Sequence, residues 1–133
     1  MQDAMTIGRL AKAARVNVET VRYYQRRGLI GEPRKPPGGQ RRYPASVVRQ
    51  IGFIRRAQQL GFTLAEVKEL LLYSDGRSIR ETRVLAERKQ GVLETHIVHL
   101  QKMRRELKAL IEKSRKAKGV GPCPIIEALN KPD

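Results

Sequence analysis

The sequence predicts a mainly α-helical chain, in which a basic N-terminal head precedes one long helix. Two short segments, 6–14 and 18–28, repeat apolar residues at helical spacing and are separated by only a few residues. A segment rich in Pro and Gly, residues 29–43, then interrupts the helical pattern. Residues 79–116 contain no Pro and only one Gly, which is typical of a continuous helix about 57 Å long.

The first two helices have recognisable start and stop signals. Thr6 is expected to cap the first helix through its hydroxyl, and Asn17 to cap the second through its side-chain carbonyl. Gly28 is expected to end the second helix, because glycine accepts the left-handed backbone that follows many helices. Val21 and Tyr24 should face the core. Two short helices joined by a brief turn have the outline of a helix-turn-helix, which many small helical proteins share.

The rest of the head is predicted to contain a wing and two further helices. The stretch "PPGGQ" suits a tight turn between two extended arms, residues 29–34 and 41–43, and basic residues lie on both arms. Residues 45–60 carry an apolar stripe at helical spacing. Thr63 is expected to cap the helix that follows, with Glu66 at the capping-box position. The predicted stripe consists of Val47, Val48, Ile51, Ile54, Ala57 and Leu60.

The long helix carries a second apolar stripe, which a head of this size cannot cover. Six apolar residues recur at gaps of three or four along a helix that is otherwise rich in Lys, Arg and Glu. Pairing with a second copy would bury them, so we expect a homodimer. The alternative is a helix folded back on its own head. The predicted dimerisation residues are Leu93, Ile97, Leu100, Met103, Leu107 and Leu110.

Charge indicates the kind of partner. The net charge is +15 over 133 residues, and residues 22–56 contain ten Lys or Arg against one acid, Glu32. Such a focused excess favours a polyanionic partner, most often nucleic acid. The alternative is a basic surface that only keeps the protein soluble.

Composition also argues against several classes of protein. No apolar run approaches the roughly 20 residues that a membrane helix needs, and no secretory signal pattern opens the sequence. One cysteine cannot form a disulfide within the chain, which fits a reducing compartment, so we expect a cytoplasmic protein with no membrane partner. We find no nucleophile–base arrangement, no Gly-rich phosphate loop and no paired carboxylates in an apolar setting, and we expect no enzymatic activity.

The second helix has the residues expected of a helix that reads a DNA groove. Arginine can read a guanine edge or bind phosphate, and tyrosine hydroxyls can bond to phosphate oxygens. Each residue alone could be ordinary solvated surface, but the set together favours contact with double-stranded DNA. An architectural or RNA-binding protein without promoter specificity is the rival interpretation. The predicted DNA-binding residues are Thr6, Asn17, Val18, Thr20, Arg22, Tyr23, Arg26, Arg41, Arg42 and Tyr43.

Specific motifs resemble a known family. Within residues 5–73, "TIGRLAKAARVNVETVRYYQRRGLI", "RRY" and "IRRAQQLGFTLAEVKELL" resemble the winged helix-turn-helix head of the MerR family of bacterial transcription regulators. "DGRSIRETRVLAERK" and "CPIIEALNK" resemble the dimer helix and C-terminal loop of its mercuric-ion-responsive branch. The resemblance implies a DNA-binding domain at 4–73, a dimerisation helix at 74–117 and an effector-loop segment at 118–133.

The resemblance also implies a mechanism. The dimer helices would form an antiparallel coiled coil, and each head would bind half of a pseudo-palindromic operator between two promoter elements. Family members repress in one state. When the effector binds, they bend and untwist the DNA so that RNA polymerase can start transcription. Because the free energy of deforming DNA depends on its sequence, this deformation contributes to sequence recognition.

The mercury-sensing branch binds its ion through three cysteines, which correspond here to Ile79, Ser114 and Cys123. Ile79 has no donor atom, and the hydroxyl of Ser114 does not ionise near neutral pH, whereas mercuric ion prefers thiolates. The resemblance therefore does not extend to a three-sulfur site. Cys123 is left with three interpretations: a packing residue in a stiff loop, a thiol made reactive by Lys116 and Lys118, or a weak metal ligand.

Overall fold

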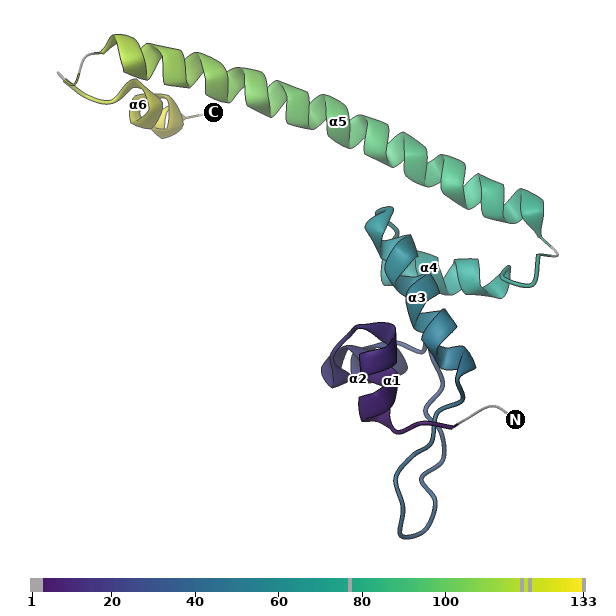
Figure 1. Ribbon diagram of the computed structural model, residues 1–133. Coiled ribbons are helices and arrows are strands. Elements are labelled where there is room, and N and C mark those ends of the chain that lie inside the picture. The colour runs from purple at the N-terminus through teal and green to yellow at the C-terminus, as the bar shows by residue number, and fades with distance from the viewer. Residues whose placement is uncertain (1–3, 77, 118, 120, 133) are drawn as a thin grey trace. The chain divides into compact units, whose positions relative to one another are not determined.

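The computed structural model describes residues 4–76, 78–117, 119 and 121–132 (Figure 1). This described part is mainly α-helical, which confirms the predicted fold class. None of its helices has a stretch apolar and long enough to span a bilayer. The helices are α1 (Ile7–Ala14), α2 (Val18–Arg26), α3 (Ser46–Gln59), α4 (Leu64–Leu72), α5 (Ile79–Lys116) and α6 (Pro124–Asn130).

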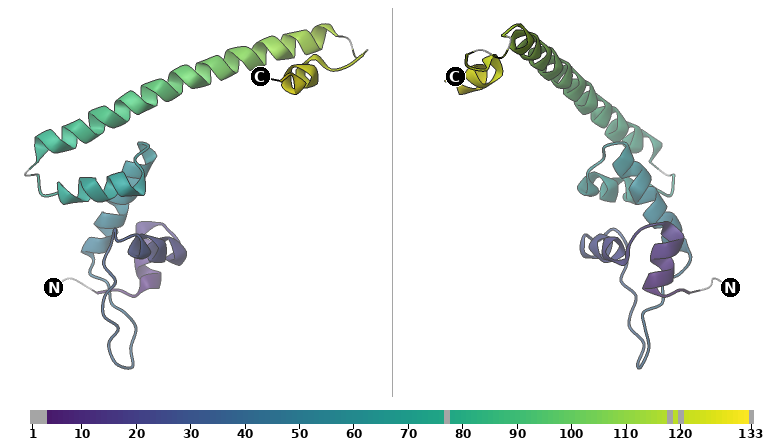
Figure 2. Two further views of the ribbon diagram at one scale, coloured as in Figure 1. Left: turned by 180° about the vertical axis from the view of Figure 1, so that it is seen from behind. Right: turned by 60° about the vertical axis from the view of Figure 1, so that its left-hand side comes forward.

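The chain divides into two compact units, residues 1–89 and residues 90–133. The first unit holds α1 to α4 and the first turns of α5, and the second unit holds the rest of α5 together with α6. Within the first unit α1 packs against both α2 and α3, and α3 packs against α4 (Figure 2). Helices α1 and α2, joined by residues 15–17, form the predicted helix-turn-helix.

Both predicted caps of the helix-turn-helix are confirmed. The Thr6 hydroxyl accepts a hydrogen bond from the N–H of Arg9 at 3.3 Å. The Asn17 side-chain oxygen accepts from both the N–H and the hydroxyl of Thr20, at 2.7 and 2.8 Å. These bonds satisfy donors at the first turns of α1 and α2 and so fix where the two helices begin. Gly28, with a φ of +74°, turns the chain after α2.

The core of the first unit is apolar and draws on α1 to α5. Val21 and Tyr24 face it as predicted, and the Tyr24 hydroxyl donates to Gln58 at 2.8 Å. Burial raises the pKa of Tyr24, so its hydroxyl keeps the proton that it donates. One prediction for the α3 stripe is wrong. Leu60 is 65% exposed, because α3 ends at Gln59 and the chain turns away there.

Residues 31–42 form a long loop, here called the wing, which extends away from the helices of the first unit (Figures 1 and 2). The predicted tight turn is confirmed, since the N–H of Gly39 donates to the carbonyl of Pro36 at 3.2 Å and Gly38 has a φ of +67°. The predicted arms do not pair as strands. The isolated bridge found in the described part of the chain joins Met5 to Tyr43 instead.

Side chains hold the two arms of the wing together in place of a strand ladder. The Arg41 guanidinium donates to the carbonyl of Pro33 at 3.0 Å and pairs with the Glu32 carboxylate at 2.8 Å. Proline has no N–H to contribute to a ladder, and the wing contains Pro33, Pro36 and Pro37. The predicted strand-like arms therefore become a loop that one arginine fastens.

A partly buried ion pair joins the first turns of α5 to α4. Thr63 and Glu66 form the predicted capping box, and Glu66 also accepts from the Lys89 ammonium at 2.8 Å. Lys89 lies 5.9 Å from the centre of the Phe62 ring, and its side chain is only 11% exposed. The hydrogen bond from Lys89, followed by that from the Thr63 N–H, holds the pKa of Glu66 below its usual value. Leu85 is buried beside this contact.

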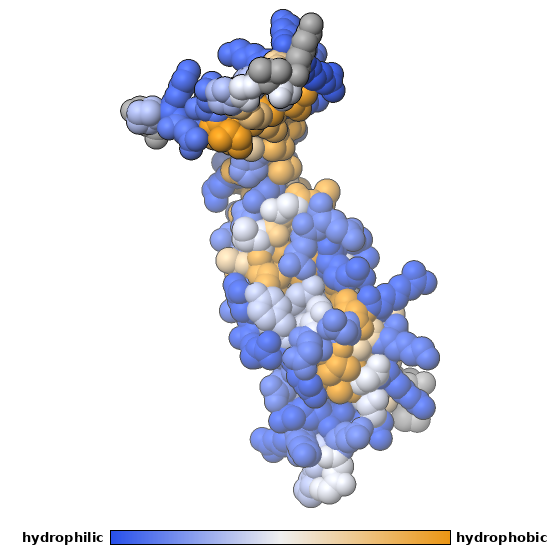
Figure 3. Space-filling view, turned by 90° about the vertical axis from the view of Figure 1, so that its left-hand side faces the viewer, coloured by the Kyte–Doolittle hydropathy of each residue, from blue (hydrophilic) through white to orange (hydrophobic). Residues whose placement is uncertain are grey.

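In the second unit, most of the predicted dimerisation stripe is exposed. Leu100, for example, is 61% exposed, and only Leu110 is half-buried. Apolar residues also reach the surface in the upper part of Figure 3, which holds α5 and α6. Within the first unit, α5 packs on the head at Leu85, which belongs to its core.

The Glu66 carboxylate should contribute to stability in a pH-dependent way. Its folded pKa is lowered, so its contribution is complete above the unfolded pKa of about 4.3 and is lost as the pH falls through the folded value. We expect Glu66→Gln to lower the free energy of unfolding by about 1 kcal/mol at pH 7 and to make no difference in strong acid. Urea denaturation at several pH values measures this. Glu69→Gln, at an exposed position on α4, is the control, and an equal loss in the control would contradict the assignment.

Candidate nucleic-acid interface

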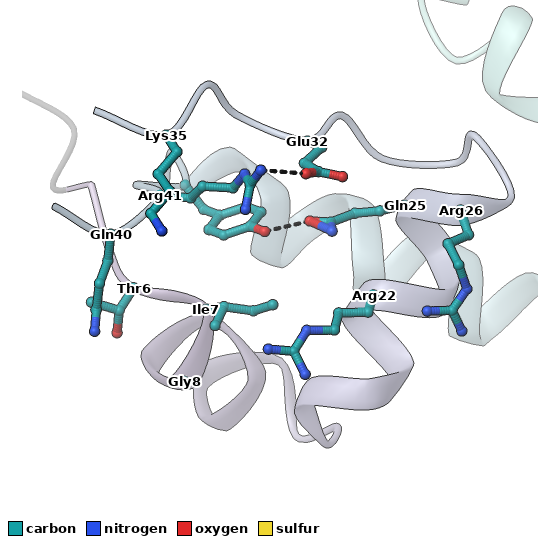
Figure 4. A pocket seen from close by; sticks show the side chains of 11 residues that line it. Thr6, Ile7, Gly8, Arg22, Gln25, Arg26, Glu32, Lys35, Gln40 and Arg41 are labelled. Carbon is teal, nitrogen blue, oxygen red and sulfur yellow. Dashed lines mark hydrogen bonds and ion pairs between the residues drawn. The ribbon is translucent and has the colours of Figure 1, made fainter. Parts of the chain in front are cut away.

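Three segments of the first unit surround an open hollow of about 610 Å³, here called the basic hollow. They are the N-terminal end of α1, one face of α2, and the wing. Figure 4 shows Arg22 and Arg26 reaching in from α2, with Lys35 and Arg41 coming from the wing. Its lining consists of Thr6, Ile7, Gly8, Arg22, Gln25, Arg26, Glu32, Lys35, Gln40, Arg41 and Tyr43.

The electrostatics of the basic hollow favour an anion. Four of its lining residues are Lys or Arg, and its one acid, Glu32, is paired with Arg41. Arg22 pairs with Glu19 at 2.8 Å, but both side chains are more than half exposed. Exposed pairs of this kind contribute at most about 1 kcal/mol, so Arg22 can exchange its carboxylate partner for a phosphate or a base edge at little cost.

The N-terminal end of α1 adds a second attraction for anions. Backbone N–H groups and the helix dipole make such an end favourable for phosphate. Gly8 lies on the rim, and a Cβ added there would meet no atom within 4 Å, so the backbone is open to close approach. A phosphate entering here would meet α1 on one side and arginine side chains on the other.

The structure brings together only part of the predicted DNA-binding set. Thr6, Arg22, Arg26 and Arg41 line the basic hollow. The other predicted residues lie outside it, apart from Tyr43. Asn17 and Thr20 bond to each other at the start of α2, Tyr23 is 39% exposed beside Arg26 and Arg27, Arg42 is exposed, and Val18 is half-buried against the core.

Tyr43 requires a correction. It was predicted to offer its hydroxyl to phosphate, but only 1% of the residue is exposed, and the hydroxyl donates to the side-chain oxygen of Gln25. Burial raises the pKa of Tyr43, so the hydroxyl remains a donor. The backbone of Tyr43 also pairs with Met5 in both directions, at 2.8 and 2.9 Å. Tyr43 is therefore a core residue whose hydroxyl positions Gln25 in the lining of the basic hollow.

The predicted DNA-binding set lacked six residues that line the basic hollow. Two of them, Glu32 and Lys35, entered the sequence analysis only as charges of the head and its wing. Gln25 could have been found, because it lies three residues after Arg22 and therefore on the same face of α2. Gln40 comes from the turn of the wing, and Ile7 and Gly8 contribute through their position at a helix end. No side-chain pattern in the sequence marks these three.

Cys123 lies in a different setting from the one predicted. The stiff loop is in part a helix, since α6 starts at Pro124 with Cys123 as its cap, and proline suits the first position of a helix. Hydrogen bonds from the N–H groups of Ile126 and Ile125, and a weaker one from the Ser114 side chain, lower the pKa of the exposed thiol. No lysine of the described residues is among the causes of this shift. Of the two lysines predicted to do so, Lys118 lies outside the described residues.

These donors do not fit a three-thiolate mercuric-ion site. Ser114 and Cys123 are together, but they offer one hydroxyl and one thiol, and Ile79 offers no donor. Among the described residues, no group of three or more His, Cys, Asp or Glu is placed to hold a metal ion.

Comparison with known proteins shows the family to which the chain belongs. Residues 5–74 match the family described as MerR HTH family regulatory protein, and residues 48–110 match the family described as MerR, DNA binding. The mercuric resistance operon regulatory protein of Shigella flexneri is 44% identical over 127 residues, which cover 96% of this chain and 88% of that protein.

Two solved structures share the fold. The lead(II) complex of the regulator PbrR691 from Ralstonia metallidurans CH34 has a TM-score of 0.80 and 32% identity, and the match covers 94% of this chain and 98% of that one. The EcmrR–DNA complex in EcmrR-RPo has a TM-score of 0.71 and 25% identity, and the match covers 86% of this chain and 41% of that one.

A helix-turn-helix with a wing and a basic hollow, on a chain with these relatives, defines a DNA-binding transcription regulator, which is a class without catalytic activity of its own. The chain belongs to the MerR family, and its relatives include the regulators of mercuric resistance operons.

Proposed function

We propose that this regulator acts in the cytoplasm as a homodimer, and that each protomer binds promoter DNA through α2 and the basic hollow. The observation that carries the proposal is the convergence of Arg22, Arg26, Lys35 and Arg41 on one hollow beside the N-terminal end of α1. Double-stranded DNA is the polyanion whose groove admits a helix such as α2 while its phosphates lie along both sides.

The roles within this interface follow from position. Arg22 and Arg26 project from the exposed face of α2, where a helix in the major groove meets base edges. Thr6 and the first turn of α1 meet phosphate, as do the basic residues of the wing, including the exposed Arg42. Asn17 and Thr20 shape the start of α2, where groove-reading helices make their base contacts.

The exposed apolar stripe on α5 supports the dimer. A helix with one exposed apolar stripe and charged residues elsewhere needs a partner, and an antiparallel coiled coil of two copies would bury it. In this proposal, a head at 4–73 is followed by a dimerisation helix at 74–117 and a C-terminal segment at 118–133. Two heads would bind a pseudo-palindromic operator, and deformation of the promoter spacer would control its use by RNA polymerase.

A second candidate concerns the signal to which the regulator responds. The exposed thiol of Cys123 has a lowered pKa, which increases the fraction of thiolate, the form that oxidants and electrophiles attack. A thiophilic metal would use the same thiolate but finds only one sulfur and the hydroxyl of Ser114, so control by oxidants or electrophiles is favoured. A sequence-independent architectural protein has less support, because α2 presents side chains that can read bases.

Base reading and phosphate contact can be separated by two matched variants. Arg22→Ala should cost roughly 1–3 kcal/mol of operator affinity and relax the preference for one base pair. Arg42→Ala should weaken binding to all sequences nearly equally and reduce the slope of affinity against salt by about one. Selection of bound sequences from a random pool, with affinity measured at several salt concentrations, tests both. An unchanged sequence preference in Arg22→Ala would remove this residue from the reading set.

Dimerisation can be tested on the α5 stripe. Leu100→Glu places a charge where the partner helix should pack, so we expect monomers and loss of operator binding. Lys102→Glu, on the other side of the same helix, is the control and should remain dimeric. Analytical ultracentrifugation measures the mass in solution, and a dimeric Leu100→Glu would show that the stripe is not the interface.

The effector can be tested through Cys123. Dilute peroxide should change transcription from a bound promoter in the wild type and not in Cys123→Ser, and thiol alkylation should proceed at a lower pH than for an ordinary cysteine, whose pKa is about 8.5. Mercuric ion, with competing thiol present, is the second arm. A response to mercury that depends on Cys123 would mean that fewer sulfurs suffice than the three of the family site.

A further inference from the structure

A second basic hollow lies between the C-terminal end of α1 and α3, and the proposed DNA contacts do not use it. Its volume is about 470 Å³, and no acid lines it. Four arginines, Arg15, Arg49, Arg55 and Arg56, border it and are here called the arginine cluster. Arg15 directly follows α1 and the other three lie on α3, so the fold assembles the cluster from separate parts of the sequence.

The arginine cluster has no internal charge compensation. Within the part of the chain that the structure describes, none of its four guanidinium groups forms an ion pair. One contact within the cluster is a long hydrogen bond of 3.4 Å from Arg55 to the carbonyl of Arg15. Four like charges held on one surface repel one another, and an anion placed between them would relieve that repulsion.

Gly52 gives the guanidinium of Arg56 its place in the cluster. A Cβ built on Gly52 would lie 3.2 Å from one terminal nitrogen of Arg56 and 3.6 Å from the other. The Arg56 side chain therefore folds back over the glycine, one turn earlier in α3. Glycine in the middle of a helix lowers its stability relative to alanine, and here its lack of a side chain leaves room for a cation.

The arginine cluster is set apart from the basic hollow. Residues 6–8 at the start of α1 line the first hollow, and residues 13–15 at its end line the second. The two ends are separated by about 12 Å along the helix axis. The dipole of α1 attracts anions at its start and repels them at its end, so in the second hollow the arginines must supply the attraction. The second hollow is not a continuation of the first.

The lining chemistry indicates what binds. Besides the arginines, Ala13, Ala14 and Val48 give the hollow an aliphatic floor. Arginine forks bind carboxylates bidentately, and an aliphatic floor suits the apolar side chains that lie between carboxylates in a peptide. A phosphodiester backbone offers arginine the same bidentate geometry, but its sugars present less apolar surface than a leucine-like side chain.

We propose that the arginine cluster is a docking site for an acidic, partly apolar peptide segment of a partner protein. This goes beyond the proposed function, because it assigns a protein contact to a surface separate from the DNA interface. It leaves the head free to hold its operator and a protein partner at the same time.

The test uses the full chain and a fluorescein-labelled peptide of alternating Glu and Leu, with a Gln–Leu peptide as the uncharged probe. The wild type should bind the Glu–Leu peptide in a salt-dependent way and ignore the Gln–Leu peptide. Arg49→Glu combined with Arg56→Glu should weaken peptide binding by about tenfold or more. The control is Lys68→Glu combined with Arg83→Glu, which changes the net charge by the same amount at exposed positions outside both hollows. It should bind the Glu–Leu peptide as tightly as the wild type does.

Gly52→Ala provides a variant in which stability and binding move in opposite directions. The added methyl group displaces the Arg56 guanidinium, so peptide affinity should fall, while the melting temperature should rise because alanine favours helix. Arg49→Gln with Arg56→Gln is the milder variant if charge reversal prevents folding.

Two results would overturn the proposal. One is equal peptide affinity in the cluster variant and in the control variant. The other is a loss of operator affinity, with a smaller salt slope, in the cluster variant alone, which would make the arginines contacts to the DNA backbone. Either result leaves the roles proposed for Arg22 and Arg42 standing, so failure here is distinct from failure of the proposed function.

Discussion

Uncompensated positive charge held on a small apolar core is the constraint on which the rest of the molecule depends. The chain carries 28 basic against 13 acidic residues, and the self-repulsion of such an excess opposes folding. The first unit limits this cost because its cations stay on the surface, in water, and no charged residue lies in its described core. The free energy lost to repulsion is regained when a polyanion binds, so the feature that weakens the free protein drives its association with DNA.

Neutral hydrogen bonds beside the basic hollow fix the position of α2. Tyr43 donates to Gln25, and Tyr24 donates to Gln58, so α2 is tied both to the end of the wing and to α3. Burying hydroxyl–amide pairs costs far less than burying charges would. Arg22 and Arg26 project from the helix that these bonds hold, with Gln25 on their own face and Tyr24 on the buried face.

Local features of the fold could be predicted from the sequence, and features set by tertiary contacts could not. Thr6, Asn17 and Thr63 cap helices through atoms only a few residues away, so the sequence contains the whole interaction. The burial of Tyr43 depends on Met5 and Gln25, which are distant in the chain, and a Tyr beside two arginines resembles a phosphate contact. The approach of Lys35 and Gln40 to α2 likewise depends on the path of the wing. A segment rich in proline has no periodic pattern from which that path could be predicted.

The boundary between the two units falls beside the one glycine of α5. Lys89, held by Glu66 and packed near Phe62, is the last residue of the first unit, and Gly91 is the only glycine in the helix. Glycine costs about 1 kcal/mol relative to alanine in a helix interior, and here no neighbouring side chain needs the space. The apolar stripe begins at Leu93, directly beyond it. The anchored part of α5 and its exposed apolar part thus meet beside the one glycine of the helix, where propensity contributes least and tertiary contacts on either side decide whether the helix continues.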